Sequence, residues 1–288
     1  MTGPVLVVGG AGRLGAAMVN AFADHAVITH TRESLDIADA SAVCKAVSAA
    51  SPAIIVNCAA FNDVDGAEDR ASEALAVNAF GVRNLARAAE TAGATLVHFS
   101  TDFVFDGTAC EPYGEESTPS PRSTYAMTKL LGEWFALDTP GAYVLRVESL
   151  FGTSKGWTGR RGSLDTIVEG IEHGRRINVF TDRVVTPSYV PDVARATQHL
   201  MESGAAPGLY HCVNSGQTTW YELAEEVGRL LDARPQLEAV TLDTVQLKAV
   251  RPRFCALSNR KLAAAGFMMP SWQDALRRWH ASRELTPR

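Results

Sequence analysis

The stretch that decides the fold is "VLVVGGAGRLGAAMVNAFA", residues 5–23. Its apolar run ends at Gly9, and Gly12 and Gly15 follow at intervals of three before apolar residues resume in a helix-like pattern. After a buried strand, the first glycine permits a tight turn, the second lets backbone N–H groups approach a pyrophosphate, and the third allows close packing of helix on sheet. The stretch therefore predicts a dinucleotide-binding turn.

Short apolar runs and amphipathic stretches alternate along the first two-thirds of the chain. The strand-like runs are residues 4–10, 26–31, 53–60 and 95–101, and the helix-like stretches include 41–50 and 73–93. Uniformly apolar strands that alternate with helices are typical of a parallel sheet buried on both faces. We expect an α/β fold, a Rossmann-type doubly wound parallel sheet with helices on both faces and a smaller C-terminal α/β substrate-binding region.

The pattern loosens after residues 142–152, and the segment 153–163 is polar, glycine-rich and basic, as in a long functional loop. Helices are expected near 164–174 and 221–233, short strands near 177–180 and 209–213, and a surface helix over 271–285. We divide the chain into an NAD(P)-binding domain, residues 1–150, and a mainly substrate-binding region, residues 151–288, interleaved with the first.

The composition is that of an ordinary soluble globular protein. Hydrophobic residues make up 46% of the 288 residues and charged residues 20%, and the formal net charge is -5. This charge gives no reason to expect nucleic acid or an anionic membrane as a partner, so any anionic ligand must be held by a local site.

The five cysteines and seven histidines are dispersed along the chain. The cysteines form no C-x-x-C pair, which favours a reducing compartment over a disulfide framework, and neither residue type has metal-ligand spacing. The N-terminus has no basic region before its apolar run, which is too short to span a bilayer. We predict a cytoplasmic protein without a metal.

The end of the second predicted strand bears on the choice of cofactor. An acidic residue there binds the ribose 2′-hydroxyl of NAD, whereas an arginine accommodates the 2′-phosphate of NADP. This chain has Thr31 and Arg32, with no carboxylate until Glu33. NADPH is therefore favoured and NADH is the alternative, since Arg32 also fits a solvated loop. Asp36 and Ile37 stand at a distance suited to the adenine pocket, although a helix N-cap region is an alternative for them; Asp39 or Ser41 could fill the cap role instead.

Two further predicted strands end in small or polar residues. One ends with Ala59 and Ala60, and another with Ser100, Thr101 and Asp102. In open α/β sheets, ligands gather in a crevice at the carboxyl ends of the strands. We expect these two strand ends to share one crevice.

The heptapeptide "STYAMTK", residues 123–129, places Tyr125 four positions before Lys129, on one helix face. That spacing alone is uninformative, because it arises by chance in many helices. A ketone that accepts hydride develops negative charge on its oxygen, and an acid must deliver a proton to it. The position of Tyr125 and Lys129 beyond the predicted crevice favours a hydride-transfer pair.

These motifs together resemble a known family. The glycine turn, "NCAA" (57–60), Asn78, "STDFVF" (100–105) and "YAMTK" (125–129) follow the order seen in extended short-chain dehydrogenases/reductases. Three longer segments, "AAFNDVDGAED" (59–69), "DRVVTPSYVPDVA" (182–194) and "RPRFCALSNRKL" (251–262), look like the dTDP-4-dehydrorhamnose reductase family. The resemblance runs nearly from end to end.

The resemblance implies roles for individual residues. Tyr125 would donate the proton, and Lys129 and the oxidised nicotinamide would stabilise its phenolate, since a free tyrosine has a pKa near ~10. Lys129 would also bond the nicotinamide ribose, and Thr101 would hold the carbonyl oxygen. Asn78 would support Lys129, with a structural role as the alternative. The implied cofactor contacts are Gly9, Gly12, Arg13, Leu14, Gly15, Thr31, Arg32, Asp36, Ile37, Ala59, Ala60, Phe61, Phe99, Tyr125 and Lys129.

The implied substrate contacts are Thr101, Asp102, Phe103, Ser149, Trp157 and Arg160. Two of them depart from the family pattern. Phe103 stands where the family has a tyrosine, and Ser149, in "RVESLFG", stands where a tryptophan would pack on the sugar. The second departure favours a different or bulkier sugar. Trp157 fits stacking on a base or sugar, and Arg160 or Arg161 fits a diphosphate, although a solvated basic loop is an equal alternative.

The resemblance implies an NAD(P)H-dependent reductase of a nucleotide-linked 4-keto-6-deoxysugar, of the kind used in dTDP-L-rhamnose-type biosynthesis. A dehydratase is disfavoured because Phe103 occupies the place of its glutamate. The alternatives are a sugar-nucleotide epimerase and a noncatalytic NADP-binding subunit resembling the regulatory subunit of methionine adenosyltransferase. The expected partner is a small-molecule nucleotide sugar, with neither nucleic acid nor membrane, and a homodimer is compatible with the sequence.

Overall fold

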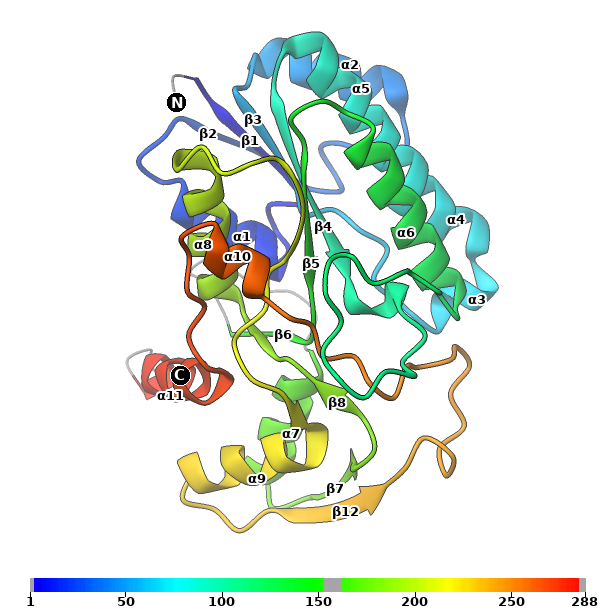
Figure 1. The fold of residues 1–288 in the computed structure, drawn as a ribbon, viewed down its shortest axis with the longest axis vertical. Coiled ribbons are helices and arrows are strands. Elements are labelled where there is room, and N and C mark those ends of the chain that lie inside the picture. Colours follow the sequence, from blue (N-terminus) through cyan, green and yellow to red (C-terminus); the bar gives the residue numbers. More distant parts are fainter. Residues whose placement is uncertain (1–2, 153–161, 285–288) are drawn as a thin grey trace.

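The computed structural model describes residues 3–152 and 162–284 (Figure 1). Its main sheet has six parallel strands in the order β10-β5-β4-β3-β1-β2. These strands are β1 (Val5–Val8), β2 (Val27–His30), β3 (Ile54–Asn57), β4 (Thr95–Thr101), β5 (Tyr143–Val147) and β10 (Gly208–His211). The chain runs outward from β1 in both directions, so a topological switch point lies between β1 and β3, where such folds bind ligands.

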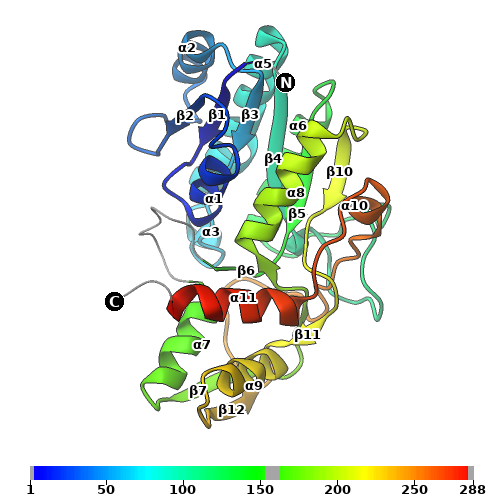
Figure 2. The ribbon, with the colours of Figure 1, turned by 90° about the vertical axis from the view of Figure 1, so that its left-hand side faces the viewer.

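Helices cover both faces of this sheet (Figures 1 and 2). The helices α2 (Ala40–Ala50), α5 (Val82–Ala92) and α6 (Thr124–Leu137) pack on one face. The opposite face carries α1 (Arg13–Ala21), α8 (Val190–Glu202) and α10 (Arg260–Ala264). Short helices α3 (Gly66–Asp69) and α4 (Ala71–Leu75) precede a π-helical turn, η1 (Ala76–Gly81), which runs into α5. The predicted fold class is confirmed.

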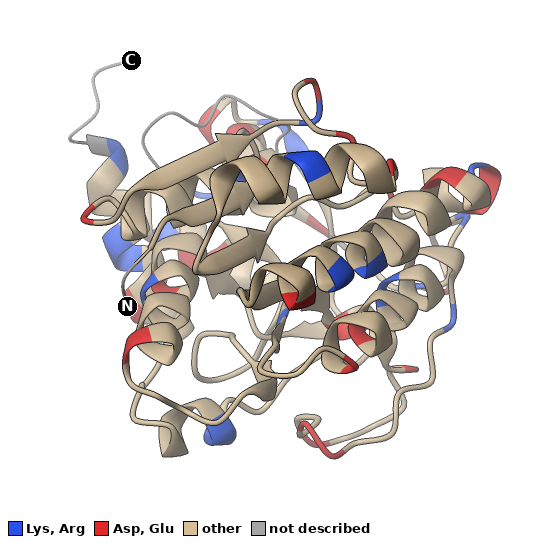
Figure 3. Ribbon diagram, turned by 90° about the horizontal axis from the view of Figure 1, so that it is seen from above, with Lys and Arg blue, Asp and Glu red and all other residues tan. Residues whose placement is uncertain are grey.

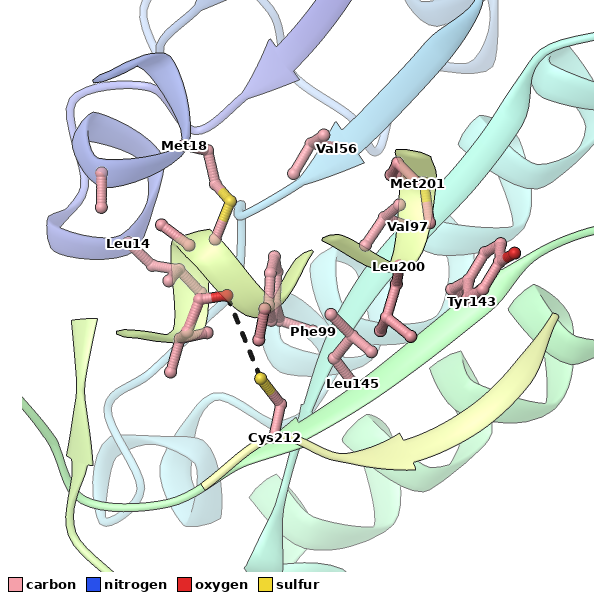
Figure 4. Packing of buried hydrophobic residues seen from close by; sticks show 14 of the residues in the cluster. Leu14, Met18, Val56, Val97, Phe99, Tyr143, Leu145, Leu200, Met201 and Cys212 are labelled. Atoms are coloured by element: carbon pink, nitrogen blue, oxygen red, sulfur yellow. Dashed lines mark hydrogen bonds between the residues drawn. The ribbon is translucent and has the colours of Figure 1, made fainter. Parts of the chain in front are cut away.

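The core beneath α1 and α8 is formed by side chains from both helices and the sheet (Figure 4). Leu14 and Met18 of α1 meet Val56 and Val97 from the sheet, while Leu200 approaches from α8. Each of these side chains is at most 7% exposed. Burial at roughly 25 cal/mol per Å² of apolar surface makes this layer a main source of stability.

A second, smaller unit lies below the main sheet in Figure 1. It contains three strand pairs, β6 (Leu150–Phe151) with β9 (Ser188–Tyr189), β7 (Arg176–Phe180) with β12 (Gln236–Val240), and β8 (Val184–Val185) with β11 (Thr218–Thr219). Its helices are α7 (Ser163–Glu172), α9 (Trp220–Leu230) and α11 (Trp272–Glu284). The last corresponds to the expected surface helix, but Leu276 and Trp279 on its inner face are buried in this unit's core.

Three elements of the C-terminal half pack on the main sheet. Strand β10 extends it beyond β5, α8 packs on α1, and α10 packs beside β10 (Figure 2). The division of function at residue 150 stays a prediction. Lys, Arg, Asp and Glu are interspersed in the view of Figure 3, without a face of one sign. Within the described residues, no helix has the length and apolar character required to cross a bilayer.

Candidate active site

The glycine turn forms a cradle at the switch point. Gly9 has a φ of 81°, and a Cβ there would lie 2.7 Å from the backbone nitrogen of Ala59. A Cβ on Gly15 would lie 2.1 Å from the carbonyl oxygen of Gly9. Only glycine fits these two positions. Gly12 precedes α1 without any side-chain cap, so no side-chain oxygen competes there for the N–H groups that bind a pyrophosphate.

A cavity of about 480 Å³ opens beside this cradle. Nine of the residues predicted to bind cofactor line it: Gly9, Gly12, Thr31, Arg32, Asp36, Ile37, Ala59, Ala60 and Phe61. The lining also includes residues that sequence reasoning missed, namely Val8, Ala11, Leu35, Ala38, Cys58, Asn62, Glu73, Ala76 and Val77. Most of these adjoin a predicted residue in sequence. Glu73, Ala76 and Val77 come from α4 and η1, and Ala76 and Val77 directly precede the predicted Asn78.

The segment after β2 distinguishes two roles that the sequence left open. Asp39 is the N-cap of α2, accepting hydrogen bonds from the backbone nitrogens of Ser41 and Ala42 at 2.8 and 3.1 Å. Asp36 instead accepts from the nitrogen of Ala38 at 2.9 Å and lines the cavity. The alternative role as helix cap therefore belongs to Asp39, and Asp36 is available to a ligand.

Six predicted cofactor contacts are not part of the lining of this cavity: Arg13, Leu14, Gly15 and Phe99, together with Tyr125 and Lys129. Arg13 donates to the carbonyl of Gly152 at 3.0 Å and forms an ion pair with Asp165 of α7, joining the glycine turn to the smaller unit. Leu14 and Phe99 belong to the core (Figure 4), and Gly15 packs against the glycine turn. Their contact with a cofactor stays a prediction.

Tyr125 and Lys129 lie on the buried face of α6. Ser123 is the N-cap of this helix and accepts from the nitrogen of Ala126 at 3.3 Å, so Tyr125 falls in the first turn. Lys129 is 3% exposed, and its Nζ donates to the carbonyl of Phe99 at 2.6 Å. Burial lowers the pKa of Lys129 to about 8, and the charge of Glu133 opposes the shift.

The phenol of Tyr125 is held by two neighbours on the segment that ends β4. The Thr101 hydroxyl lies beside it, and the Tyr125 ring meets Phe103 edge-on at a centroid distance of 5.9 Å. Burial raises the pKa of Tyr125, the charge of Asp102 raises it further, and the neighbouring Thr101 hydroxyl opposes both. The stabilisation of the phenolate that the resemblance implies involves Lys129 together with the oxidised nicotinamide, and it stays a prediction.

Asn78 lies in η1, where a π-turn often accompanies a functional site. Its Oδ1 accepts from the nitrogen of Phe61 at 2.8 Å, and its Nδ2 donates to the Phe61 carbonyl and to Thr128 Oγ1, both at 3.1 Å. Thr128 in turn donates to the carbonyl of Tyr125. These bonds connect Asn78 with Phe61 at the cofactor cavity and with Thr128 of α6, and its support of Lys129 stays a prediction.

A buried pair of carboxyl groups adjoins the site. In the sheet register Thr101 pairs with Val147, so Asp102 and Glu148 follow neighbouring strands at the same edge. The Thr101 hydroxyl donates to Asp102 Oδ1 at 2.8 Å. Ser149 has a φ of 45°, unusual for a residue with a side chain, and marks a sharp change of direction after Glu148. Sequence reasoning missed Glu148, although an acid directly after a buried strand was a usable signal.

One of the three remaining predicted substrate contacts, Ser149, belongs to the described residues. Ser149 is partly exposed at the strand end. Trp157 and Arg160 lie outside the described residues, as does Arg161. Their predicted contacts with substrate stay predictions.

A larger, open cavity of about 1030 Å³ lies beyond the β10 edge of the sheet. It is lined by charged and polar side chains, including Glu115, Arg260 and Lys261. No residue of the predicted site lines it. The smaller cavity, in contrast, is lined by the glycine cradle and by nine of the residues predicted to bind cofactor, while Thr101 and Tyr125 lie outside its lining.

Comparison with known proteins agrees with this geometry. Residues 2–284 match the family model described as the RmlD substrate binding domain. The chain is 35% identical to a dTDP-4-dehydrorhamnose reductase of Streptomyces griseus, over 96% of this chain and 90% of the relative. It is 37% identical to a probable dTDP-4,6-dihydroxy-2-methyloxan-3-one 4-ketoreductase of Streptomyces antibioticus, over 94% and 92% of the two chains.

A solved structure shows the same architecture. The dTDP-4-dehydrorhamnose reductase of Bacillus anthracis, in complex with NADP, superposes with a TM-score of 0.92 at 29% identity, over 98% of this chain and 100% of the other. The match extends through the cofactor cavity, α6 and the smaller unit. The chain therefore belongs to the dTDP-4-dehydrorhamnose reductase family.

Proposed function

We propose that this protein is an NADPH-dependent reductase of a dTDP-linked 4-keto-6-deoxysugar. The observation that carries the proposal is the grouping of Thr101, Tyr125 and Lys129 at the strand edge that also holds the glycine cradle. Relatives that match nearly the whole chain are named as dTDP-4-dehydrorhamnose reductase and dTDP-4-keto-6-deoxy-D-glucose reductase. Both names describe reduction at a ketone of a nucleotide sugar.

The chain's own residues supply the proton side of this reaction. NADPH, when bound, supplies the hydride. The hydroxyl of Tyr125 donates a proton to the carbonyl oxygen as charge develops there, and Thr101 shares in holding that oxygen. The resulting phenolate lies on the same helix face as the Lys129 ammonium, whose positive charge offsets it. Phe103 fixes the plane of the Tyr125 ring.

The cradle fits a dinucleotide. At Gly9 and Gly15, any added Cβ would meet backbone atoms at 2.7 and 2.1 Å, so the turn is as closely packed as such a site requires. Arg32 is exposed at the cavity rim, where it is suited to a 2′-phosphate. The Bacillus anthracis relative was solved with NADP. NADPH is accordingly the proposed cofactor, with NADH as the alternative.

The identity of the sugar is assigned at the level of class. Ser149 follows β5 at the position where the family pattern has a tryptophan that would narrow the site. The smaller side chain supports a sugar with more bulk on that side. The basic stretch 155–162 stays a proposed diphosphate contact. A homodimer also remains a prediction from the sequence.

Substrate-dependent oxidation of NADPH tests the proposal. The purified protein is mixed with NADPH and a panel of dTDP-linked 4-keto-6-deoxysugars, and absorbance loss is followed together with product identification. We expect turnover with at least one member and a product reduced at C4. No turnover across the panel, together with tight binding to another protein, would favour the noncatalytic subunit instead. An interconverted sugar without net NADPH consumption would indicate an epimerase.

A further inference from the structure

A pair of buried carboxyl groups, Asp102 and Glu148, lies behind the Thr101 hydroxyl. They are 5% and 2% exposed, and their oxygens lie within 4.8 Å of each other and of Cys255 Sγ. They sit at the carboxyl ends of adjacent strands because β4 and β5 pair in register up to Thr101 and Val147. Nothing in the proposed reaction yet uses Glu148.

The two oxygens of Glu148 differ in their surroundings. Oε2 accepts a hydrogen bond from the Thr186 nitrogen at 2.8 Å and a short one from the Thr186 hydroxyl. Oε1 is fully buried and has no hydrogen-bond partner among the described residues. A buried carboxylate oxygen without a donor is costly, whereas a protonated one carries its own hydrogen.

The charges around Glu148 and Asp102 balance when one of the two carboxyl groups is ionised. The groups that face it are Asp102 from the end of β4, Arg183 from the segment before β8, and the Cys255 thiol, beside Thr186. Arg183 is the one cation acting on both carboxyl groups among the interactions found for the described residues. One carboxylate balances it, and a second would leave a buried negative charge uncompensated. Burial raises the pKa of both carboxyl groups, that of Glu148 well above its usual range, with the charge of Asp102 adding to the effect.

The Thr101 hydroxyl has a single hydrogen. When Asp102 is ionised, that hydrogen is committed to Asp102 Oδ1 at 2.8 Å, and Thr101 accepts from the Phe103 nitrogen at 3.2 Å. It then has none to offer a substrate oxygen. When Asp102 carries the proton, the same contact reverses, Asp102 donates, and the Thr101 hydrogen is released toward the substrate.

We propose that Asp102 and Glu148 hold one proton between them, and that Glu148 is a positioning residue whose proton lets Asp102 turn the Thr101 hydroxyl toward the substrate carbonyl. The proton leaves Glu148 and is taken up by Asp102, so the pair keeps a net charge of minus one. No bond other than O–H is made or broken. The effect on turnover rests on the proposed function, whereas the shared proton does not.

Infrared spectroscopy of the substrate-free protein tests the shared proton directly. Glu148→Gln keeps the side-chain shape but cannot ionise, and Glu90→Gln, at an exposed position of α5, is the matched control. At neutral pH, the spectrum of Glu148→Gln should lack one protonated carboxylic acid band that the wild-type spectrum shows. This holds whichever of the two residues carries the proton in wild type. The control should show the loss of one carboxylate band. The double variant Asp102→Asn with Glu148→Gln should lose one band of each kind.

Loss of a carboxylate band from Glu148→Gln would mean that both groups are ionised and would overturn the proposal. A stoichiometric, chelator-removable metal ion in the purified protein would also overturn it, because Asp102, Glu148 and Cys255 would then be deprotonated ligands. This result is independent of turnover. Absence of turnover in wild type with the expected spectrum would therefore contradict the proposed function alone.

Turnover tests the positioning role. Glu148→Ala should lower kcat about tenfold or more, the equivalent of one hydrogen bond to a charged group, and leave the affinity for NADPH unchanged. Glu148→Gln should lower kcat to a similar extent, because its amide supplies no proton to Asp102, which then stays ionised and keeps the Thr101 hydrogen. Equal kcat in Glu148→Ala and wild type would remove Glu148 from this role, as would a kcat in Glu148→Gln close to that of wild type.

Discussion

Replacing Lys129 by methionine should remove the free-energy cost of burying an ammonium group in the site. The ammonium group is buried, and its pKa falls from 10.5 to about 8. Below about pH 8, Lys129 is charged in both the folded and the unfolded chain, and its burial penalty is fully present. Between about pH 8 and 10.5 the unfolded chain alone keeps the proton, so stability rises with pH.

The size of this effect follows from the shift. Each pKa unit corresponds to about 1.4 kcal/mol, so the free energy of unfolding of wild type should rise by about 2 kcal/mol relative to Lys129→Met between pH 7 and about pH 9.5. At pH 7, relief of the burial penalty is partly offset by loss of the hydrogen bond to the Phe99 carbonyl, which contributes about 1.5–3 kcal/mol. The variant should therefore be close to wild type in stability at pH 7, while its turnover is lost.

Urea unfolding across this pH range provides the measurement, with Lys45→Met, at an exposed position of α2, as the matched control. The control should follow wild type at every pH. A difference between wild type and Lys129→Met that stays constant with pH would refute the reasoning, because it would show that burial does not shift the protonation of Lys129.

Two further predictions concern the cofactor cavity. Gly15→Ala places a Cβ 2.1 Å from the Gly9 carbonyl oxygen, so the free energy of unfolding measured in urea should fall by about 1–3 kcal/mol, and titration should show weaker NADPH binding. In Gly12→Ala the Cβ lies 3.2 Å from the same oxygen, so this variant should lose less stability. Equal losses in the two variants would contradict the packing argument. Arg32→Asp should shift the ratio of kcat/KM for NADPH and NADH toward NADH by about tenfold, or about 1.4 kcal/mol. An unchanged ratio would show that the 2′-phosphate is recognised elsewhere.

The sequence predicted the cofactor half of the molecule well because its signals are local. The glycine spacing, the apolar strands and the small residues after β3 each constrain backbone geometry within a few positions. Eight of the nine predicted residues that line the cavity were singled out by such local positions, and Phe61 was implied by the family resemblance. The sequence left open which of Asp36 and Asp39 caps the helix, since both side chains can accept a hydrogen bond from a nearby backbone nitrogen. The observed hydrogen bonds distinguish the two roles.

The other half of the site depends on contacts between distant segments. Glu148 matters because strand register places it beside Asp102, and because Thr186 and Arg183 approach from another part of the chain. The direction of the Tyr125 pKa also depends on such contacts, since burial and the Asp102 charge are tertiary effects. A surface helix was expected near the C-terminus, yet Trp279 is buried in the smaller unit, because amphipathic periodicity does not reveal what covers the apolar face.

The most direct test of the proposed reductase is Tyr125→Phe, assayed by NADPH oxidation with the sugar nucleotide that wild type reduces best. Removing the hydroxyl deletes the proton donor but keeps the ring that packs against Phe103. We predict a fall in kcat of about a hundredfold or more, the range for a general acid, with NADPH affinity nearly unchanged. A variant with the kcat of wild type would contradict the assignment of Tyr125 as the acid at this site.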